Sequence, residues 1–261
     1  MPNDFTFYFV AAIAVLFVGL AKGGMGEALS LLGVPILSLV TSPVQAAALL
    51  LPILIVMDGV SLWAWRHDND RKTLLMMLPG ALAGIAIGWF TAAQVPRDAL
   101  RLIIGAITVG FVLRYAYTAW QARRGQHVEP RGHSWPLAAV LGLGAGYGSF
   151  VAHSGGPFFQ IYGLPLRLPP RAYTGAIVRF FAILNVVKIV PYVALGQLGS
   201  ANLATSATLF PLAAVATFAG SLVVKRMRPT IFYPFMYSMA FLAGLKLLSD
   251  GIGTLIPLQS P

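Results

Sequence analysis

The sequence predicts an all-α polytopic membrane protein made of two inverted-topology repeats, and three observations support this class. First, 57% of the 261 residues are hydrophobic and only 10% are charged, whereas soluble domains carry about a quarter charged residues. Second, the uncharged runs 28–57, 73–96 and 189–224 each exceed the roughly 20 residues that cross a bilayer as a helix. Third, glycines and prolines recur at matching positions in the two halves of the chain.

Each half is expected to form a short-helix, re-entrant hairpin followed by three transmembrane helices. Breaks at charged residues, proline and glycine divide the chain into ten apolar runs, of which the first two and the sixth and seventh are short. The runs are 5–21, 27–41, 44–65, 73–94, 98–120, 135–147, 149–165, 171–195, 203–224 and 231–249. Two thin spans in place of each hairpin would leave the parity of the chain unchanged.

The repeat appears as ordered matches at two fixed shifts. The matched pairs are Gly24 with Gly146, Gly26 with Gly148, Gly33 with Gly155, Pro35 with Pro157, Pro43 with Pro165, Pro79 with Pro211 and Gly88 with Gly220. Because three spans is an odd number, the second half enters the membrane from the opposite face, as in many secondary transporters. We therefore expect a first membrane repeat at 1–122, a cytoplasmic connecting loop at 123–134 and a second repeat at 135–261.

Loop charge predicts the orientation. Placing 66–72, 121–134, 166–172 and 225–230 on one side gathers eleven lysines and arginines there, against Arg97 and Arg101 on the other side. Such an excess marks the cytoplasmic side, so both termini are predicted to be periplasmic in a bacterial inner membrane. Basic loops thus account for the net charge of +10 without a nucleic-acid partner. The chain begins without the basic stretch of a cleaved signal peptide, so the first apolar run is expected to stay.

Charged residues inside the apolar runs are costly unless they pair or line water. The cations are Lys22, Arg114, Arg179, Lys188 and Lys246, and the acids are Glu27 and Asp58. An excess of cations favours an anionic ligand. Lys246 and Arg114 lie near helix ends and are interpreted as snorkelling residues, whereas Asp58 is either a structural partner near Arg66 or a proton carrier.

Lys22 begins the glycine-rich segment AKGGMGE, which predicts a break between two short helices. A second helix starting near Gly26 would direct free N–H groups and its positive dipole end at the break, a known way to bind anions. The candidate binding residues of this first tip are Lys22, Gly23, Gly24, Met25 and Gly26. The alternative is that these glycines only permit close helix packing, which is the favoured interpretation for Gly84 and Gly88.

The segment GAGYGSF predicts a second tip of the same construction, with Ser149 as a possible N-cap. Its candidate residues are Gly146, Tyr147, Gly148, Ser149 and His153, and His153 is equally well explained as a hydrogen-bonded structural histidine. We expect the two inverted tips to meet near the membrane midplane. Arg179 is the preferred additional ligand, because Arg179 and Lys188 are nine residues apart and point to nearly opposite faces of one helix.

The sequence offers little other chemistry. The four histidines lack metal-ligand spacing, cysteine is absent, and no H-E-x-x-H, P-loop or G-x-S-x-G motif occurs. Neither an enzyme nor a metal or cofactor site is therefore expected.

Two segments, GLAKGGMGEALSLLGVP and GLGAGYGSFVAHSGGP, together with the later PGALAGIAIG and PLAAVATFAG, resemble the sulfite exporter TauE/SafE family over nearly the whole chain. The resemblance implies movement of small sulfur-containing anions across the bacterial inner membrane. Lys22 before the first glycines and a second tip with fewer glycines depart from the family pattern.

These observations together predict a secondary transporter that exports a small sulfur oxyanion, with sulfite as the preferred substrate. The alternatives are another oxyanion or organosulfonate, such as sulfoacetate or thiosulfate, moved in either direction, or an anion channel with the same site. Glu27 or Asp58 would couple transport to protons. The expected partners are the anion and the lipid bilayer, and the oligomeric state stays open.

Overall fold

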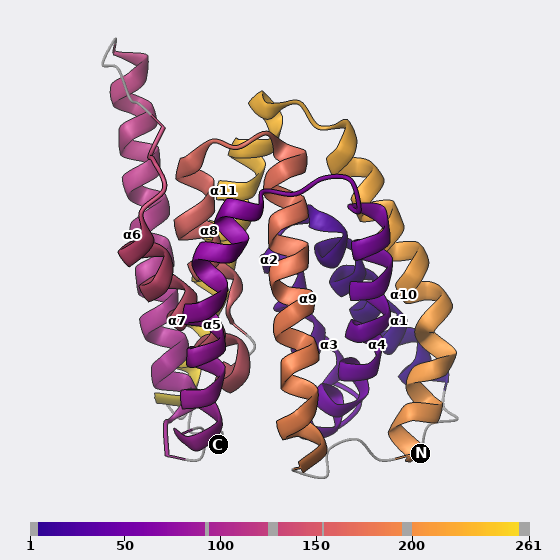
Figure 1. Cartoon of the computed structure of the whole chain (residues 1–261). Helices are drawn as coiled ribbons and strands as arrows, with labels where there is room; N and C mark the ends of the chain where they lie inside the picture. Colours follow the sequence, from indigo (N-terminus) through magenta and orange to yellow (C-terminus); the bar gives the residue numbers. More distant parts are fainter. Residues whose placement is uncertain (1–4, 92–93, 125–129, 153, 195–199, 256–261) are drawn as a thin grey trace. The chain divides into compact units, whose positions relative to one another are not determined.

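The computed structural model describes residues 5–91, 94–124, 130–152, 154–194 and 200–255, and within these ranges the chain is helical with no strand (Figure 1). Six helical segments in these ranges are long and apolar enough to cross a membrane. They are Phe5–Met25, Arg71–Thr91, Asp98–Gln121, Pro170–Val190, Leu203–Arg226 and Pro229–Ile252, with shorter apolar helices at Leu49–Ala64 and Trp135–Val151. The prediction of a helical, multi-pass membrane protein is confirmed.

Each half ends in three long helices, as predicted. The segment Phe5–Met25 before them in the first half is itself long and apolar enough to cross a membrane, so the re-entrant hairpin stays a prediction. The first half contains α1 (Phe5–Leu20), η1 (Ala21–Met25), α2 (Glu27–Ser30), α3 (Gly33–Leu37), α4 (Pro43–Ala64), α5 (Arg71–Thr91) and α6 (Arg97–Arg123). The second half contains α7 (Trp135–Ala152), α8 (Gly156–Gly163), η2 (Leu164–Leu166), α9 (Pro170–Ala194), α10 (Ser200–Arg226) and α11 (Pro229–Leu255).

The helices group into two compact units that do not coincide with the two halves of the sequence. Unit 1 comprises Met1–Asp70 and Pro170–Phe232, and unit 2 comprises Arg71–Pro169 and Tyr233–Pro261. Each unit therefore combines helices from both halves. Unit 1 holds α1 to α4 with α9 and α10, whereas unit 2 holds α5 to α8 with most of α11.

In unit 1, α1 packs against α3 and α10, and α4 packs against α9 and α10. Apolar side chains from α1, α3, α4 and α10 form its main core: Ala11, Ala14, Val15, Val18, Leu37, Ala46, Leu49, Leu50, Ile53, Met57, Leu209 and Ala213. Small residues let α1 approach α10. A β-carbon on Gly19 would lie 2.6 Å from the Ala216 Cβ, and one on Gly23 would lie 2.4 Å from the Thr217 carbonyl oxygen.

In unit 2, α5 and α7 pack closely along their length through glycines spaced four residues apart. A β-carbon on Gly80 or Gly84 would lie 2.2 Å from a carbonyl oxygen of α7, and one on Gly142 would lie 2.2 Å from a carbonyl oxygen of α5. Gly146 is tighter still, at 1.9 Å from the Ala81 carbonyl oxygen. Small residues spaced four positions apart commonly allow the backbones of membrane helices to pack closely. The packing interpretation of Gly84 is confirmed.

The predicted break at GAGYGSF is wrong. Helix α7 runs without interruption from Trp135 to Ala152, so Ser149 lies inside the helix and is not an N-cap. Gly146 faces the α5 backbone, whereas Gly144 and Gly148 lie against Phe158, and this packing offsets the low helix propensity of the glycines. The chain instead leaves the helix just after Ala152 and re-enters it at Gly156, with Pro157 in the first turn of α8.

The end of the connecting loop is fastened to unit 2 by Arg131. Its backbone N–H donates to the Pro165 carbonyl at 3.0 Å, and its Nη2 donates to the carbonyls of Tyr162 at 2.6 Å and Ile161 at 3.2 Å. Burial lowers the pKa of the Arg131 guanidinium, although an arginine stays charged in proteins. Arg131 thus satisfies carbonyls at the C-terminal end of α8, where a positive charge is favourable.

The packing of α5 on α7 predicts that Gly146→Leu lowers the free energy of unfolding by about 1–3 kcal/mol, because overpacking at this contact forces the two helices apart. The measurement is the midpoint of thermal unfolding of the full-length protein in detergent. Gly110→Leu is the matched control, since a β-carbon on Gly110 of α6 meets nothing within 4 Å. Equal midpoints for the two variants would contradict the packing role.

Candidate functional site

The first predicted break is confirmed. After α1 the helix widens over Ala21–Met25, and the backbone then turns through Gly24 at φ 119° and Gly26 at φ 102°. Both values lie in a region that side-chain-bearing residues rarely adopt, so glycine is required at these two positions. The next helix, α2, begins at Glu27 but has only four residues. Because a helix dipole sums over aligned peptides, α2 contributes little to the predicted anion site at a helix start.

One face of α4 holds this break in place through three side chains spaced three and four residues apart. The Ser61 hydroxyl donates to the Lys22 carbonyl at 2.7 Å, and the Trp65 indole N–H donates to the Gly23 carbonyl at 3.1 Å. Asp58, one turn before Ser61, binds the Lys22 side chain. Carbonyls released by the irregular backbone are therefore satisfied by α4, as buried polar groups require.

Lys22 forms a part-buried ion pair with Asp58, and Asn185 donates a hydrogen bond to the same carboxylate. The Lys22 Nζ lies 2.7 Å from the Asp58 Oδ1, and the Asn185 Nδ2 donates to the Asp58 Oδ2 at 2.6 Å. Only 16% of the Lys22 side chain and 9% of the Asp58 side chain are exposed. We call Lys22, Asp58 and Asn185 the Lys22 cluster. It joins η1, α4 and α9, and its pairing makes two buried charges tolerable.

A second buried cation lies on the same helix as Asn185. Lys188 is 3% exposed and follows Asn185 by three residues on α9, a spacing that places both side chains on one helix face. Among the residues whose burial is described, Asp58 and Lys188 are the charged side chains with less than a tenth of their surface exposed. The elements that the cluster joins thus carry the cations Lys22 and Lys188, with Asp58 as the acid among the cluster's side chains.

The α10 side of the break is formed by backbone and by small side chains. The Gly23 α-carbon approaches the Thr217 carbonyl and the Ser221 N–H so closely that a β-carbon would overlap both. The Thr217 hydroxyl is fully buried and has no hydrogen-bond partner. Such an unsatisfied buried donor is uncommon in native proteins. Thr217, whose backbone contacts Gly23, thus also carries a buried hydroxyl without a hydrogen-bond partner.

Arg179, the preferred additional ligand, binds carbonyl groups. Its two Nη atoms donate to Trp65 at 2.8 Å, Arg66 at 3.0 Å, Asp68 at 2.5 Å and Gly175 at 2.9 Å. Three of these carbonyls directly follow the end of α4, where unsatisfied carbonyls and the negative dipole end favour a cation. This capping role accounts for Arg179, whose Nη atoms are directed at carbonyl oxygens.

The other predicted site residues lie in unit 2. Gly146 and Gly148 are buried inside α7, the Tyr147 hydroxyl accepts from the Thr91 Oγ1 at 3.2 Å, and Ser149 is 3% exposed. His153 lies outside the described residues, as does the side chain of Glu27. The structure therefore joins Lys22 with Asp58 within unit 1, while the predicted meeting of the two tips stays a prediction.

Asn185 was not predicted from the sequence. Asp58 was predicted to be either a structural partner near Arg66 or a proton carrier, and in the structure it pairs with Lys22. The signal for Asn185 was present, because it is a polar residue in the apolar run FFAILNVVKIV, three residues before a buried lysine. Lys246 pairs with Asp250 one turn away, and the Arg114 side chain is exposed. Their interpretation as snorkelling residues stays a prediction.

Comparison with known proteins assigns the family. The family model described as "Sulfite exporter TauE/SafE" matches residues 11–247, from α1 to α11. No curated protein and no solved structure matches the chain significantly. The matched region contains both halves of the sequence and every residue of the Lys22 cluster. The chain belongs to the sulfite exporter TauE/SafE family.

Proposed function

We propose that this protein is a secondary transporter that exports sulfite across a bacterial inner membrane, with the anion bound at the Lys22 cluster. Family membership makes the chain a membrane transporter of sulfur anions. The choice of sulfite, the inner membrane and the outward direction are the proposal.

The observation that carries the proposal is a buried lysine at a helix break inside a membrane-spanning segment. Lys22 lies in the segment Phe5–Met25, which is long and apolar enough to span the membrane. A membrane protein retains an ionisable residue at such a position mainly for a substrate or ion pathway. Discontinuous helices with exposed backbone are the usual substrate sites of secondary transporters, and the turn at Gly24 and Gly26 is such a discontinuity.

The surrounding groups suit a compact oxyanion. Lys22 and Lys188 supply positive charge, and Asn185 supplies N–H donors close to the Lys22 ammonium group. The side chains on the α10 side are small, with Gly23 against Thr217 and Ser221, and do not offer a stacking platform for an aromatic sulfonate. Sulfite is small, rich in acceptor oxygens and a reactive nucleophile, so a cell that releases it from sulfonates gains by expelling it.

Helix packing supports the proposed inverted repeat. In unit 1 the first helix of the first half, α1, packs against α10, the second-last helix of the other half. In unit 2 the first helix of the second half, α7, packs against α5, which holds the equivalent place in the first half. Both contacts use glycines spaced four residues apart, at 19 and 23 in α1 and η1 and at 142 and 146 in α7. An inverted repeat generates this exchange of partners.

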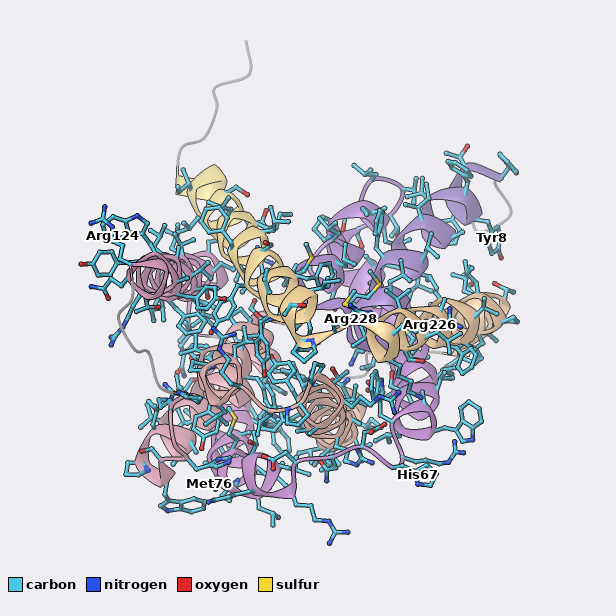
Figure 2. All side chains as sticks on the ribbon, turned by 90° about the horizontal axis from the view of Figure 1, so that it is seen from above. Tyr8, His67, Met76, Arg124, Arg226 and Arg228 are labelled. Atoms are coloured by element: carbon cyan, nitrogen blue, oxygen red, sulfur yellow. The ribbon has the colours of Figure 1, made fainter. Side chains whose placement is uncertain are left out.

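Exposed basic residues support the proposed orientation. Arg66, Arg71, Arg226 and Arg228, all on the predicted cytoplasmic side, are exposed. Figure 2 shows the side chains of Arg226 and Arg228 where α10 gives way to α11, and that of His67 pointing away from its ribbon after α4. Such positions are suited to water and lipid headgroups.

The orientation predicts that Gly132→Cys labels from the cytoplasm and Gln94→Cys labels from the periplasm. Both positions are exposed and the chain has no other cysteine, so each label reports one site. The measurement is labelling of intact cells with a membrane-impermeant maleimide, which should modify only Gln94→Cys. Modification of Gly132→Cys in intact cells would reverse the topology.

For the binding site, we expect Lys22→Gln to weaken sulfite binding at least tenfold, or about 1.4 kcal/mol, because it removes the central cation. The single variant leaves Asp58 buried without its partner, which is strongly destabilising. The double variant Lys22→Gln/Asp58→Asn removes both charges and should fold while still failing to bind. Calorimetric titration of purified protein with sulfite, thiosulfate and sulfoacetate measures the effect and ranks the anions.

The matched control for that pair is Lys246→Gln/Asp250→Asn, which removes a Lys–Asp pair on α11 whose side chains are 26% and 29% exposed. It should bind sulfite like the unmodified protein. Unchanged affinity in the Lys22/Asp58 double variant would place the anion elsewhere, and tighter binding of thiosulfate or sulfoacetate than of sulfite would change the assigned substrate.

The direction of transport predicts that cells making the protein survive added sulfite better than cells making the Lys22→Gln/Asp58→Asn variant. The physical reason is that only the unmodified protein can lower the internal concentration of this nucleophile. The measurement is growth in rising sulfite, together with the sulfite that appears outside cells fed a sulfonate. Equal growth and equal release in the two strains would argue against export.

A further inference from the structure

We propose that Asp58 is the internal counter-ion of Lys22 and that a substrate anion takes its place only when Asp58 binds a proton. This inference rests on the proposed function, because it concerns the same site. It adds the linkage that the fold imposes, in which one proton is taken up for each anion bound.

The Lys22 ammonium group is already occupied by the Asp58 carboxylate. Its Nζ is 2.7 Å from the Asp58 Oδ1, so an anion within hydrogen-bond distance of Nζ would lie beside a carboxylate. Two negative charges at such separation repel strongly in a site screened from water. The Asp58 Oδ2 is held by the Asn185 Nδ2 at 2.6 Å, which resists rotation of the carboxylate away from Lys22. Neutralising Asp58 removes the repulsion without moving the backbone.

The charges around Asp58 come from each helix that surrounds it. Lys22 lies on η1. Asn185, which is neutral, and the buried Lys188 lie on one face of α9. On α10, Lys225 donates to the Ala64 carbonyl at 2.5 Å and lies 5.1 Å from the centre of the Trp65 ring. Among the described side chains, Asp58 is the acid that pairs with Lys22, so a neutral Asp58 leaves the positive charge of Lys22 for the anion to compensate.

The proton balance is simple. A proton passes from the aqueous phase to an oxygen of Asp58, the carboxylate becomes a carboxylic acid, and Lys22 keeps its own proton and positive charge. The anion then accepts hydrogen bonds from Lys22 in place of Asp58. When the anion leaves, Asp58 releases the proton and pairs with Lys22 again, so the empty site carries no unpaired Lys22 charge across the membrane.

Asp58 fits this role better than the other acids whose side chains are described. It is the acid with less than a tenth of its surface exposed, whereas Asp98 and Asp250 are about a third exposed and pair with basic residues three and four positions along their own helices. A partly exposed carboxylate within one helix gains nothing from an anion bound elsewhere. Asp58 on α4 bonds Lys22 on η1 and Asn185 on α9, so its protonation changes the contacts between these three elements.

One consequence concerns the driving force for export. Divalent sulfite leaving with one proton moves a single negative charge outward. An inside-negative membrane potential favours that movement, so proton linkage is compatible with export and lowers the charge carried in each cycle by one.

The test is the pH dependence of sulfite binding to the purified full-length protein, measured by calorimetry in two buffers of different ionisation enthalpy. For the unmodified protein we expect uptake of one proton per sulfite beyond what sulfite itself contributes. Asp58→Asn supplies that baseline, because it lacks the titrating carboxylate. It should bind sulfite at least tenfold more tightly at alkaline pH and without extra proton uptake. Asp250→Asn is the control and should behave like the unmodified protein.

A second variant keeps the test decisive if Asp58→Asn does not fold. Asn185→Leu removes the amide that donates to the Asp58 Oδ2, so the midpoint of the pH dependence of sulfite binding should differ from that of the unmodified protein. A merely structural Asn185 would leave that midpoint unchanged, which would overturn the inference, as would the same proton uptake in Asp58→Asn and the unmodified protein. Failure of the unmodified protein to bind sulfite, thiosulfate or sulfoacetate at any pH would instead overturn the proposed function.

Discussion

The rest of this structure depends on one constraint, which is that the membrane interior offers no water to satisfy a broken helix or a charge. The chain breaks a spanning segment at Ala21–Gly26 and places a lysine in it. Side chains on one face of α4 stabilise both features. Ser61 and Trp65 donate hydrogen bonds to the free carbonyls, and Asp58 pairs with Lys22. This also fixes α9 against α4, because Asn185 on α9 donates a hydrogen bond to the second oxygen of the Asp58 carboxylate.

A second consequence of the same environment is the use of glycine where two helices touch. In a bilayer an apolar side chain is as stable against lipid as against another helix, so the hydrophobic effect does not drive helices together. Close packing of their backbones contributes the stabilisation instead. Gly23 on the α10 contact and Gly146 on the α5 contact each leave no room for a β-carbon. Two glycine-rich segments of similar sequence therefore have different roles. The glycines of α7 are helical and serve helix packing, whereas Gly24 and Gly26 form a turn whose φ angles require glycine.

The membrane class, the helix order and the first break follow from composition, run lengths and the segment AKGGMGE, because hydropathy and backbone freedom are local properties of the sequence. The second break was misplaced, since GAGYGSF has the same local appearance, and only the contact with α5 distinguishes a packed glycine from a turning one. The pairings of Lys22 with Asp58 and of Arg179 with the carbonyls after α4 were also beyond prediction. They join residues 36 and 114 positions apart, and helical periodicity does not report which helices meet.

The division of the chain into units that each borrow helices from both halves has a consequence for biogenesis. Lys22 and Asp58 both lie in the first 70 residues, within the first segment of unit 1, so the nascent chain can neutralise its buried charges early. The α10 surface that covers Gly19 and Gly23 is made only when the last quarter of the protein emerges from the ribosome. Until then the first helices expose a glycine-lined face to lipid or to the insertion machinery, and folding of unit 1 is completed only after translation of α10.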